Sequence, residues 1–118
     1  MVQGLDADKA AQLNAGLARI RERFVQSLSD RIDAFYELLG DLRDPGSWQD
    51  ACAEIRASAH KLHGICASVG FSKIGQNAAQ VEYLIDGLGP TLRERDIDEV
   101  RSLLNLLLDE MEQHLDAA

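Results

Sequence analysis

The chain has 118 residues, which suffices for one domain with a hydrophobic core but not for a nucleotide-binding enzyme domain beside it. Hydrophobic residues make up 46% of the sequence and aromatic residues only 5%, a composition that favours helices packed through aliphatic side chains over β-sheets. The formal net charge is −8 and no basic stripe offsets it, so we expect no nucleic-acid partner.

The first residues, up to Asn14, show neither the basic region nor the apolar run of a secretion signal. No stretch of the sequence is apolar for long enough to cross a bilayer. We therefore expect a cytoplasmic protein without a membrane partner. The two cysteines, Cys52 and Cys66, lie fourteen positions apart in one predicted helix, too far apart for a disulfide, and are expected to be reduced and buried.

The first helical segment is predicted from Asp8 to about Leu42, because apolar residues recur at helical spacing along it. Its inward-facing residues are predicted to be Leu13, Leu17, Ile20, Phe24, Leu28, Ile32, Phe35, Leu38 and Leu39. The segment is either one long helix or two. Ser29 and Asp30 could form an N-cap, which favours a break or kink between Ser27 and Asp30.

A turn is predicted at residues 43–46, where Pro45 and Gly46 favour chain reversal. The second helix is predicted to begin after Ser47 as its N-cap and to end at Gly70. Its buried stripe is predicted to consist of Trp48, Ala51 or Cys52, Ile55, Ala59, Leu62, Ile65 or Cys66, and Val69.

A third helix is predicted to start at Ser72 as its cap and to end in the segment 87–90. Its inward-facing residues are predicted to be Ile74, Ala78, Val81, Leu84 and Ile85. The last helix is predicted from about Thr91 or Asp96 to Leu115. Its inward-facing residues are predicted to be Val100, Leu103, Leu104, Leu107, Met111 and Leu115.

Amphipathic helices joined by short turns are best packed as an antiparallel bundle. The sequence therefore predicts an all-α fold, an antiparallel up-down four-helix bundle with an additional or kinked N-terminal helix. We expect a single domain over residues 1–118. This architecture alone does not determine a function.

The second helix carries a solvent-facing histidine. His60 lies about 160° around the helix from Leu62, the centre of the buried stripe. Its face is shared by Ala57, His63 and Ala67, so apart from the second imidazole the surroundings are predicted to be small and open.

Gly64 follows His60 by one turn of the same helix. A glycine inside a helix costs about 1 kcal/mol relative to alanine, so a compensating reason is expected. One interpretation is open access to His60 for a bulky group or a partner surface. The alternative is that Gly64 lets a neighbouring helix pack closely.

The segment from Ala59 to Gly70 resembles the signature of histidine-containing phosphotransfer domains. That signature reads histidine, any residue, an aliphatic residue, lysine, glycine, two small residues, two variable residues, an aliphatic residue and glycine. The matching positions are His60, Leu62, Gly64, Val69 and Gly70. The family's order of helices also covers nearly the whole chain.

This resemblance implies that His60 accepts a phosphoryl group and that Glu82, on the next helix, lies beside it. It also implies a docking surface around Arg56, Ala57 and Ala67, with His63 and Gly64 next to the phosphate. The implied partners are the receiver domains of response regulators and a histidine kinase. The chain would be a monomeric carrier rather than an enzyme, without a cofactor or metal of its own, and the receiver would supply Mg²⁺.

Three positions depart from the signature. His63 replaces the usual lysine, and Ile65 and Cys66 replace small residues. A lysine supplies a fixed positive charge near the phosphate, whereas an imidazole supplies one only when protonated, a form that an adjacent phosphate favours. We therefore expect the rate of phosphotransfer by this chain to depend on pH more strongly than it would with a lysine at position 63.

Several alternatives stay open at this point. His60, His63 and Cys66 have a spacing that invites metal binding, but Cys66 lies about 120° from His60, which disfavours one shared ion. A helical adaptor with an incidental histidine is a second alternative. A sensor-kinase dimerisation segment is a third, although its usual proline soon after the histidine is missing here. The chain could also be the phosphotransfer fragment of a larger chemotaxis-type or hybrid histidine kinase.

Overall fold

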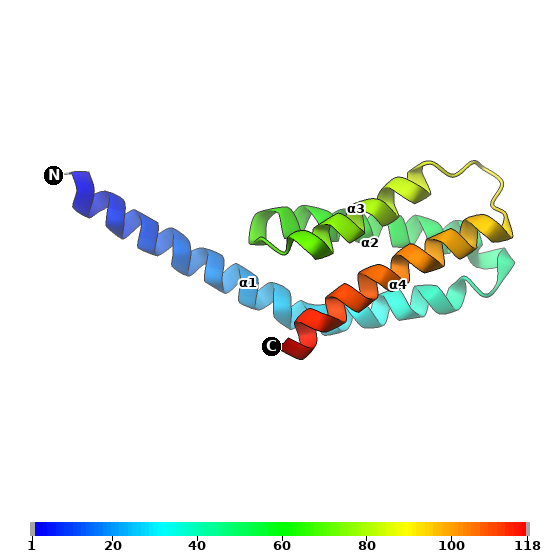
Figure 1. The fold of residues 1–118 in the computed structure, drawn as a ribbon, viewed down its shortest axis with the longest axis horizontal. Coiled ribbons are helices and arrows are strands. Elements are labelled where there is room, and N and C mark those ends of the chain that lie inside the picture. The colour runs from blue at the N-terminus through cyan, green and yellow to red at the C-terminus, as the bar shows by residue number, and fades with distance from the viewer. Residues whose placement is uncertain (1, 118) are drawn as a thin grey trace.

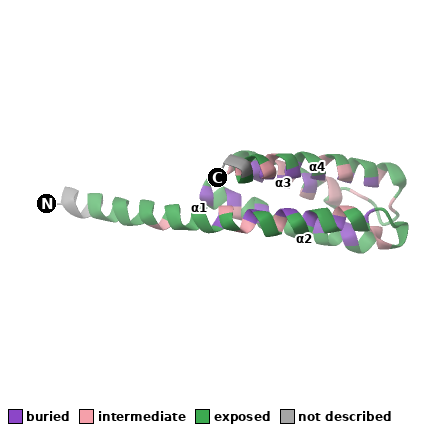
Figure 2. Cartoon of the chain, turned by 90° about the horizontal axis from the view of Figure 1, so that it is seen from below, coloured by how far each residue is buried: buried purple, intermediate pink, exposed green. Residues whose placement is uncertain are grey.

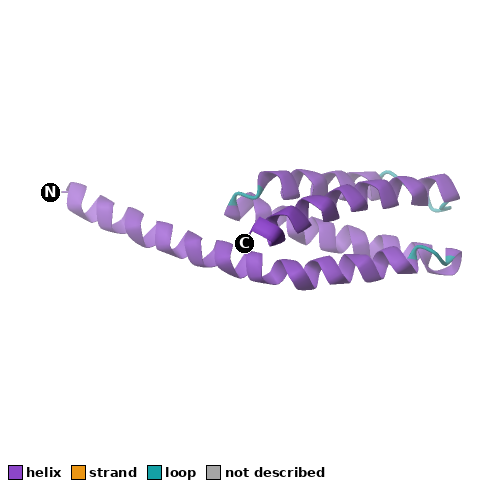
Figure 3. Ribbon diagram, turned by 60° about the horizontal axis from the view of Figure 1, so that its bottom comes forward, coloured by secondary structure: helices purple, strands orange, loops and turns teal. Residues whose placement is uncertain are grey.

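The computed structural model describes the backbone of residues 2–117 and the side chains of residues 7–115. Its helices are α1 (Val2–Asp41), α2 (Trp48–Val69), α3 (Ser72–Asp86) and α4 (Glu94–Ala117), with a 3₁₀ turn, η1 (Pro45–Ser47), before α2 (Figures 1 and 3). Each helix packs against the next, and α4 packs back against α1. The predicted all-α, up-down four-helix bundle is confirmed, and no strand occurs in residues 2–117.

The core is aliphatic, and it begins at Phe24. From Phe24 onward nearly all positions predicted to face inward are buried or half-buried, because the helical period places them opposite a neighbouring helix. Leu115 is an exception, with 37% of its surface exposed, while Ile97 and Leu108 are buried although they were not predicted to be. Among the described helices, none is both long and apolar enough to cross a bilayer.

Helix α1 is continuous over 40 residues, so of the break or kink predicted between Ser27 and Asp30, the break is wrong. The hydroxyl of Ser27 donates to the carbonyl of Phe24, 2.6 Å away within the same helix. Such a back-bond bends a helix without ending it. Figure 1 shows α1 changing direction where its pale-blue part becomes cyan, so the chain bends where a kink or break was expected.

The N-terminal part of α1, residues 7–23, is called the arm below, and most of it projects beyond the bundle (Figure 2). Leu13, Leu17 and Ile20 were predicted to face the core, but they are 68%, 39% and 48% exposed. The reason is that α2 ends beside Arg21, whose Nε donates to the carbonyl of Val69 at 2.8 Å. Beyond that point no described helix of the bundle stands opposite the arm.

The loops fix where the helices begin and end. Ser47 occupies the N-cap position of α2 as predicted, but its hydroxyl bonds Asp44 instead of a helix amide. Gly70 ends α2 with φ 87°, the left-handed conformation that glycine adopts readily. Phe71, not Ser72, holds the N-cap position of α3. This tight connection lays α3 antiparallel against α2.

Candidate functional site

His60 stands on the solvent side of α2, in the second half of the helix. Its side chain is 67% exposed, whereas its neighbours Ala59 and Leu62 face the bundle and are fully buried. Burial of these two residues against the other helices fixes the rotation of α2. The orientation of His60 is therefore set by core packing, as the helical spacing predicts.

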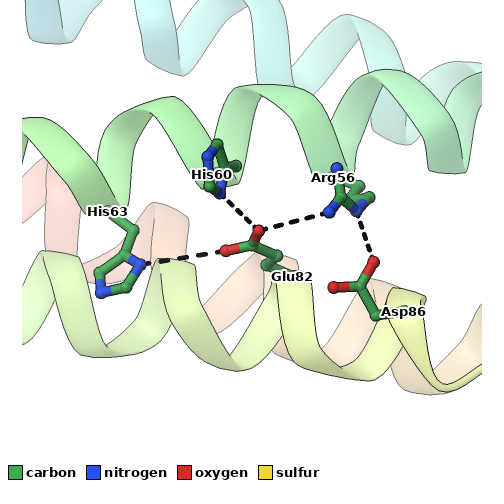
Figure 4. Close-up of polar contacts among 5 residues, drawn as sticks. All are labelled: Arg56, His60, His63, Glu82 and Asp86. Atoms are coloured by element: carbon green, nitrogen blue, oxygen red, sulfur yellow. Dashed lines mark hydrogen bonds and ion pairs between the residues drawn. The ribbon is translucent and has the colours of Figure 1, made fainter.

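Glu82 reaches His60 from α3. Its Oε2 atom lies 2.6 Å from Nδ1 of His60, and its side chain is only 15% exposed (Figure 4). An ionised carboxylate can only accept hydrogen bonds, so Nδ1 of His60 carries the proton. In the neutral ring this leaves Nε2 with a free lone pair, the condition for a nucleophile.

Glu82 is itself held by two further side chains of α2. Nη2 of Arg56 lies 3.7 Å from Oε2 of Glu82, and Nδ1 of His63 lies 3.9 Å from its Oε1 (Figure 4). The carboxylate therefore sits between the two histidines and the arginine. Of these three partners, His60 makes the shortest contact with the carboxylate.

Asp86 is a further member of this group and was not predicted from the sequence. Nε of Arg56 donates to Oδ1 of Asp86 at 2.5 Å, and this hydrogen bond raises the pKa of the arginine above its usual range. A signal for it exists in the sequence, because Arg56 and His60 on α2 and Glu82 and Asp86 on α3 are both spaced i, i+4. We call Arg56, His60, His63, Glu82 and Asp86 the His60 cluster.

His63 lies one turn after His60 and is 49% exposed. It stands on the same side of α2 as His60 and faces the same carboxylate (Figure 4). A phosphate on His60 would thus have a second imidazole one helical turn away. Arg56, one turn before His60, is the nearest group with a permanent positive charge in the cluster.

The surroundings of Gly64 are open. A Cβ atom built at this glycine meets nothing within 4 Å, so the alternative that Gly64 allows close packing of a helix is wrong. That packing role belongs to Gly75 on α3, where a Cβ atom would lie 3.0 Å from the Cβ of Cys66. Gly64 instead leaves space beside His60.

Two shallow grooves flank the ridge of α2 on which His60 stands. Ala57 lines the groove between α1 and α2 together with Arg31 and Ala34. Ala67 lines the groove between α2 and α3 together with His63. Both alanines are exposed, so a convex partner surface could approach His60 from above without meeting a large side chain from either.

The alternative of a metal site does not fit this geometry. Cys66 is 1% exposed within the core, and burial raises the pKa of its thiol to about 11. The thiolate that metals require is thus disfavoured, and the sulfur lies on a different side of α2 from His60. In the described part of the chain, no three His, Cys, Asp or Glu residues are grouped as metal ligands.

Comparison with known families gives one match. Residues 19–118 match the family model described as "Hpt domain". No curated protein and no solved structure matches the chain. The matched region begins in the arm and includes the whole four-helix bundle and all five residues of the His60 cluster.

Proposed function

Because the chain belongs to the Hpt domain family, whose members carry phosphoryl groups on histidine in two-component phosphorelays, we propose that His60 is the phosphoacceptor. The observation that supports this most directly is the 2.6 Å contact between Nδ1 of His60 and Glu82. In the neutral ring this contact leaves Nε2 unprotonated, on a side chain that is 67% exposed.

The chemistry that we propose is an exchange of one bond for another. Nε2 of His60 attacks the phosphorus of an aspartyl phosphate on a receiver domain, the N–P bond forms, and the bond to the aspartate oxygen breaks. The aspartate leaves as a carboxylate. No proton is transferred, because Nδ1 of His60 keeps its hydrogen and donates it to Glu82 throughout.

Glu82 has a second role in this scheme. Phosphorylation at Nε2 leaves a ring that is protonated at Nδ1 and formally positive. The carboxylate of Glu82 stabilises that charge through the hydrogen bond it already makes. Transfer back to an aspartate reverses the same steps.

Arg56 and His63 are proposed to act through charge. Arg56 keeps its positive charge across the physiological pH range and lies one turn from His60, beside the carboxylate of Glu82. His63 adds a second positive charge only when it is protonated. Together they take the place of the lysine that the Hpt signature usually has at the position of His63.

The proposed partners are receiver domains and a histidine kinase. Docking would use the exposed ridge of α2, with Ala57 and Ala67 in the grooves on either side of His60. We propose that the receiver supplies Mg²⁺ and the catalytic groups, so that this chain contributes a nucleophile and a docking surface. On this scheme it is a phosphoryl carrier and not an independent enzyme.

The test is incubation with a receiver domain carrying radiolabelled aspartyl phosphate, followed by measurement of acid-labile, base-stable label on the chain. We expect the wild type to be labelled and the His60→Gln variant to remain unlabelled. His63→Gln is the matched control, because it removes the neighbouring exposed imidazole on the same helix, and it should still be labelled.

Two results would contradict the proposal. Equal labelling of wild type and His60→Gln would place the phosphate elsewhere. No label on any variant, across several receivers and a histidine kinase, would favour the helical adaptor.

A further inference from the structure

The arm carries an apolar stripe that the bundle does not cover. Leu13, Leu17 and Ile20 follow each other at spacings of four and three, and Phe24 continues the row into the core. One side of the arm is thus a direct extension of the inward face of α1. The three residues before Phe24 remain substantially exposed.

The charged residues nearest the stripe of the arm are basic. At about 100° per residue, the basic residues Lys9, Arg21 and Arg23 lie within about 90° of the centre of the stripe. The acidic residues Asp8 and Glu22 lie on the opposite side, together with one basic residue, Arg19. The stripe is therefore apolar with basic flanks. This contrasts with the chain as a whole, whose net charge is −8.

A groove between α3 and α4 has the complementary character. Its apolar lining includes Tyr83, Leu84, Leu88 and Leu103, and Tyr83 is 83% exposed. The charged residues that line it and its extension along α4 are Glu99 and Asp98, both acidic, and Asp98 is paired with Arg101, whose Nη1 donates to its Oδ1 at 3.0 Å. We call this feature the α3–α4 groove.

The arm of one chain cannot readily reach its own α3–α4 groove. The arm leaves the bundle beside Val69, at the end where α2 passes into α3, and points away from it (Figure 1). The groove is lined by Leu88 and Glu99 on either side of the α3–α4 loop, at the opposite end. In two chains laid antiparallel, each arm would extend toward the other chain's groove.

From this complementarity we propose that the arm of one chain docks in the α3–α4 groove of a second copy of the same chain. Leu13, Leu17 and Ile20 would cover the apolar lining, and Lys9 and Arg23 would face the acidic rim. Because both contacts form at once about a two-fold axis, the assembly closes as a dimer. This proposal departs from the monomer expected from the sequence.

Pairing of two arms along their stripes is the competing arrangement, and charge disfavours it. Each stripe has basic flanks at Lys9 and Arg23, so two stripes in contact would bring like charges together. Docking in the groove brings opposite charges together instead. His60 lies on α2, outside the groove, so the dimer does not depend on the proposed phosphotransfer.

Sedimentation equilibrium of the full chain over a range of concentrations, at low and high salt, tests the proposal. The wild type is expected to form dimers that weaken as salt rises. Leu13→Glu on the arm and Tyr83→Glu in the groove should each raise the dissociation constant by about tenfold or more. Both residues are exposed, so neither substitution disturbs the core.

The matched control for the arm is Ala15→Glu, which adds the same charge on the side away from the stripe and should leave the dimer intact. A mixture of Leu13→Glu and Tyr83→Glu chains should associate more tightly than either variant alone, since one contact of the pair is restored. Loss of the dimer with Leu13→Glu but not with Tyr83→Glu would overturn the proposal in favour of paired arms. A wild type that stays monomeric at all concentrations would also overturn it.

Discussion

A single hydrogen bond, between Nδ1 of His60 and Glu82, decides which nitrogen of the imidazole can react. Helical spacing predicts from the sequence that His60 is exposed, because it depends only on the rotation of α2. The family resemblance predicted that Glu82 lies beside His60, whereas the contribution of Asp86 was not predicted. Both depend on the register between α2 and α3, which no single helix encodes.

Two substitutions of Glu82 distinguish the effect of its hydrogen bond to His60 from the effect of its negative charge. Glu82→Gln keeps an oxygen acceptor for Nδ1 but removes the negative charge, whereas Glu82→Ala removes both. We expect Glu82→Ala to slow phosphorylation of His60 by about tenfold to hundredfold and Glu82→Gln to slow it less. Rates of transfer from a phosphorylated receiver measure this, with circular dichroism as the check on folding. Equal rates for wild type and Glu82→Ala would show that the contact does not matter.

His63 is expected to make transfer pH-dependent. Imidazoles titrate in the range from about pH 6 to 8, so the positive charge near the phosphate is lost as pH rises, whereas a lysine would keep it. The rate for the native chain should therefore fall relative to His63→Lys between pH 6 and 8. Transfer rates of both proteins across this range are the measurement, and a constant ratio would count against a charge role for His63.

At the scale of helices, one glycine in α2 and one in α3 have different structural roles. Gly75 lets the helices approach, and Gly64 keeps the surface beside His60 clear. Helical periodicity predicted most of the buried stripe of each helix, since buried positions recur every three to four residues. It could not tell which glycine faces a neighbour, because that depends on which helix lies opposite.

Alanine substitution should have opposite effects at these two glycines. Gly64→Ala meets no atom and removes the conformational cost of glycine, so we expect the free energy of unfolding to rise by about 0.5–1 kcal/mol. Gly75→Ala places its Cβ against the Cβ of Cys66, which the backbone of α2 holds in place, so we expect a loss of about 1–3 kcal/mol. Urea denaturation measures both values. A stability loss with Gly64→Ala would mean that another element packs there.

At the scale of the whole molecule, the bundle and the arm differ in how they are stabilised. The bundle buries an aliphatic core that starts at Phe24, while the arm exposes its large apolar residues (Figure 2). The same periodicity predicted Leu13, Leu17 and Ile20 to face inward as it did Phe24. A sequence pattern shows which face of a helix is apolar, but not whether the fold provides a partner for that face.

Removal of residues 1–18 tests whether the bundle is stable without most of the arm. The Hpt match begins at residue 19, and Arg21 is kept. For the monomer, measured below the concentration at which dimers form, we expect the free energy of unfolding to change by less than about 1 kcal/mol, since side chains that are exposed in the monomer contribute little. Phosphorylation of His60 should persist. Phe24→Ala in the full chain is the comparison, with an expected loss of about 3–5 kcal/mol. Unfolding of the shortened chain would show that the arm belongs to the core.

The central claim is that Nε2 of His60 carries the phosphoryl group while Nδ1 stays bonded to Glu82. NMR of the chain labelled with ¹⁵N at histidine, after phosphorylation by a receiver, tests it most directly through the coupling between phosphorus and ring nitrogen. We predict coupling to Nε2 of His60, with Nδ1 protonated. Coupling to Nδ1 of His60, or to a nitrogen of His63, would contradict the claim.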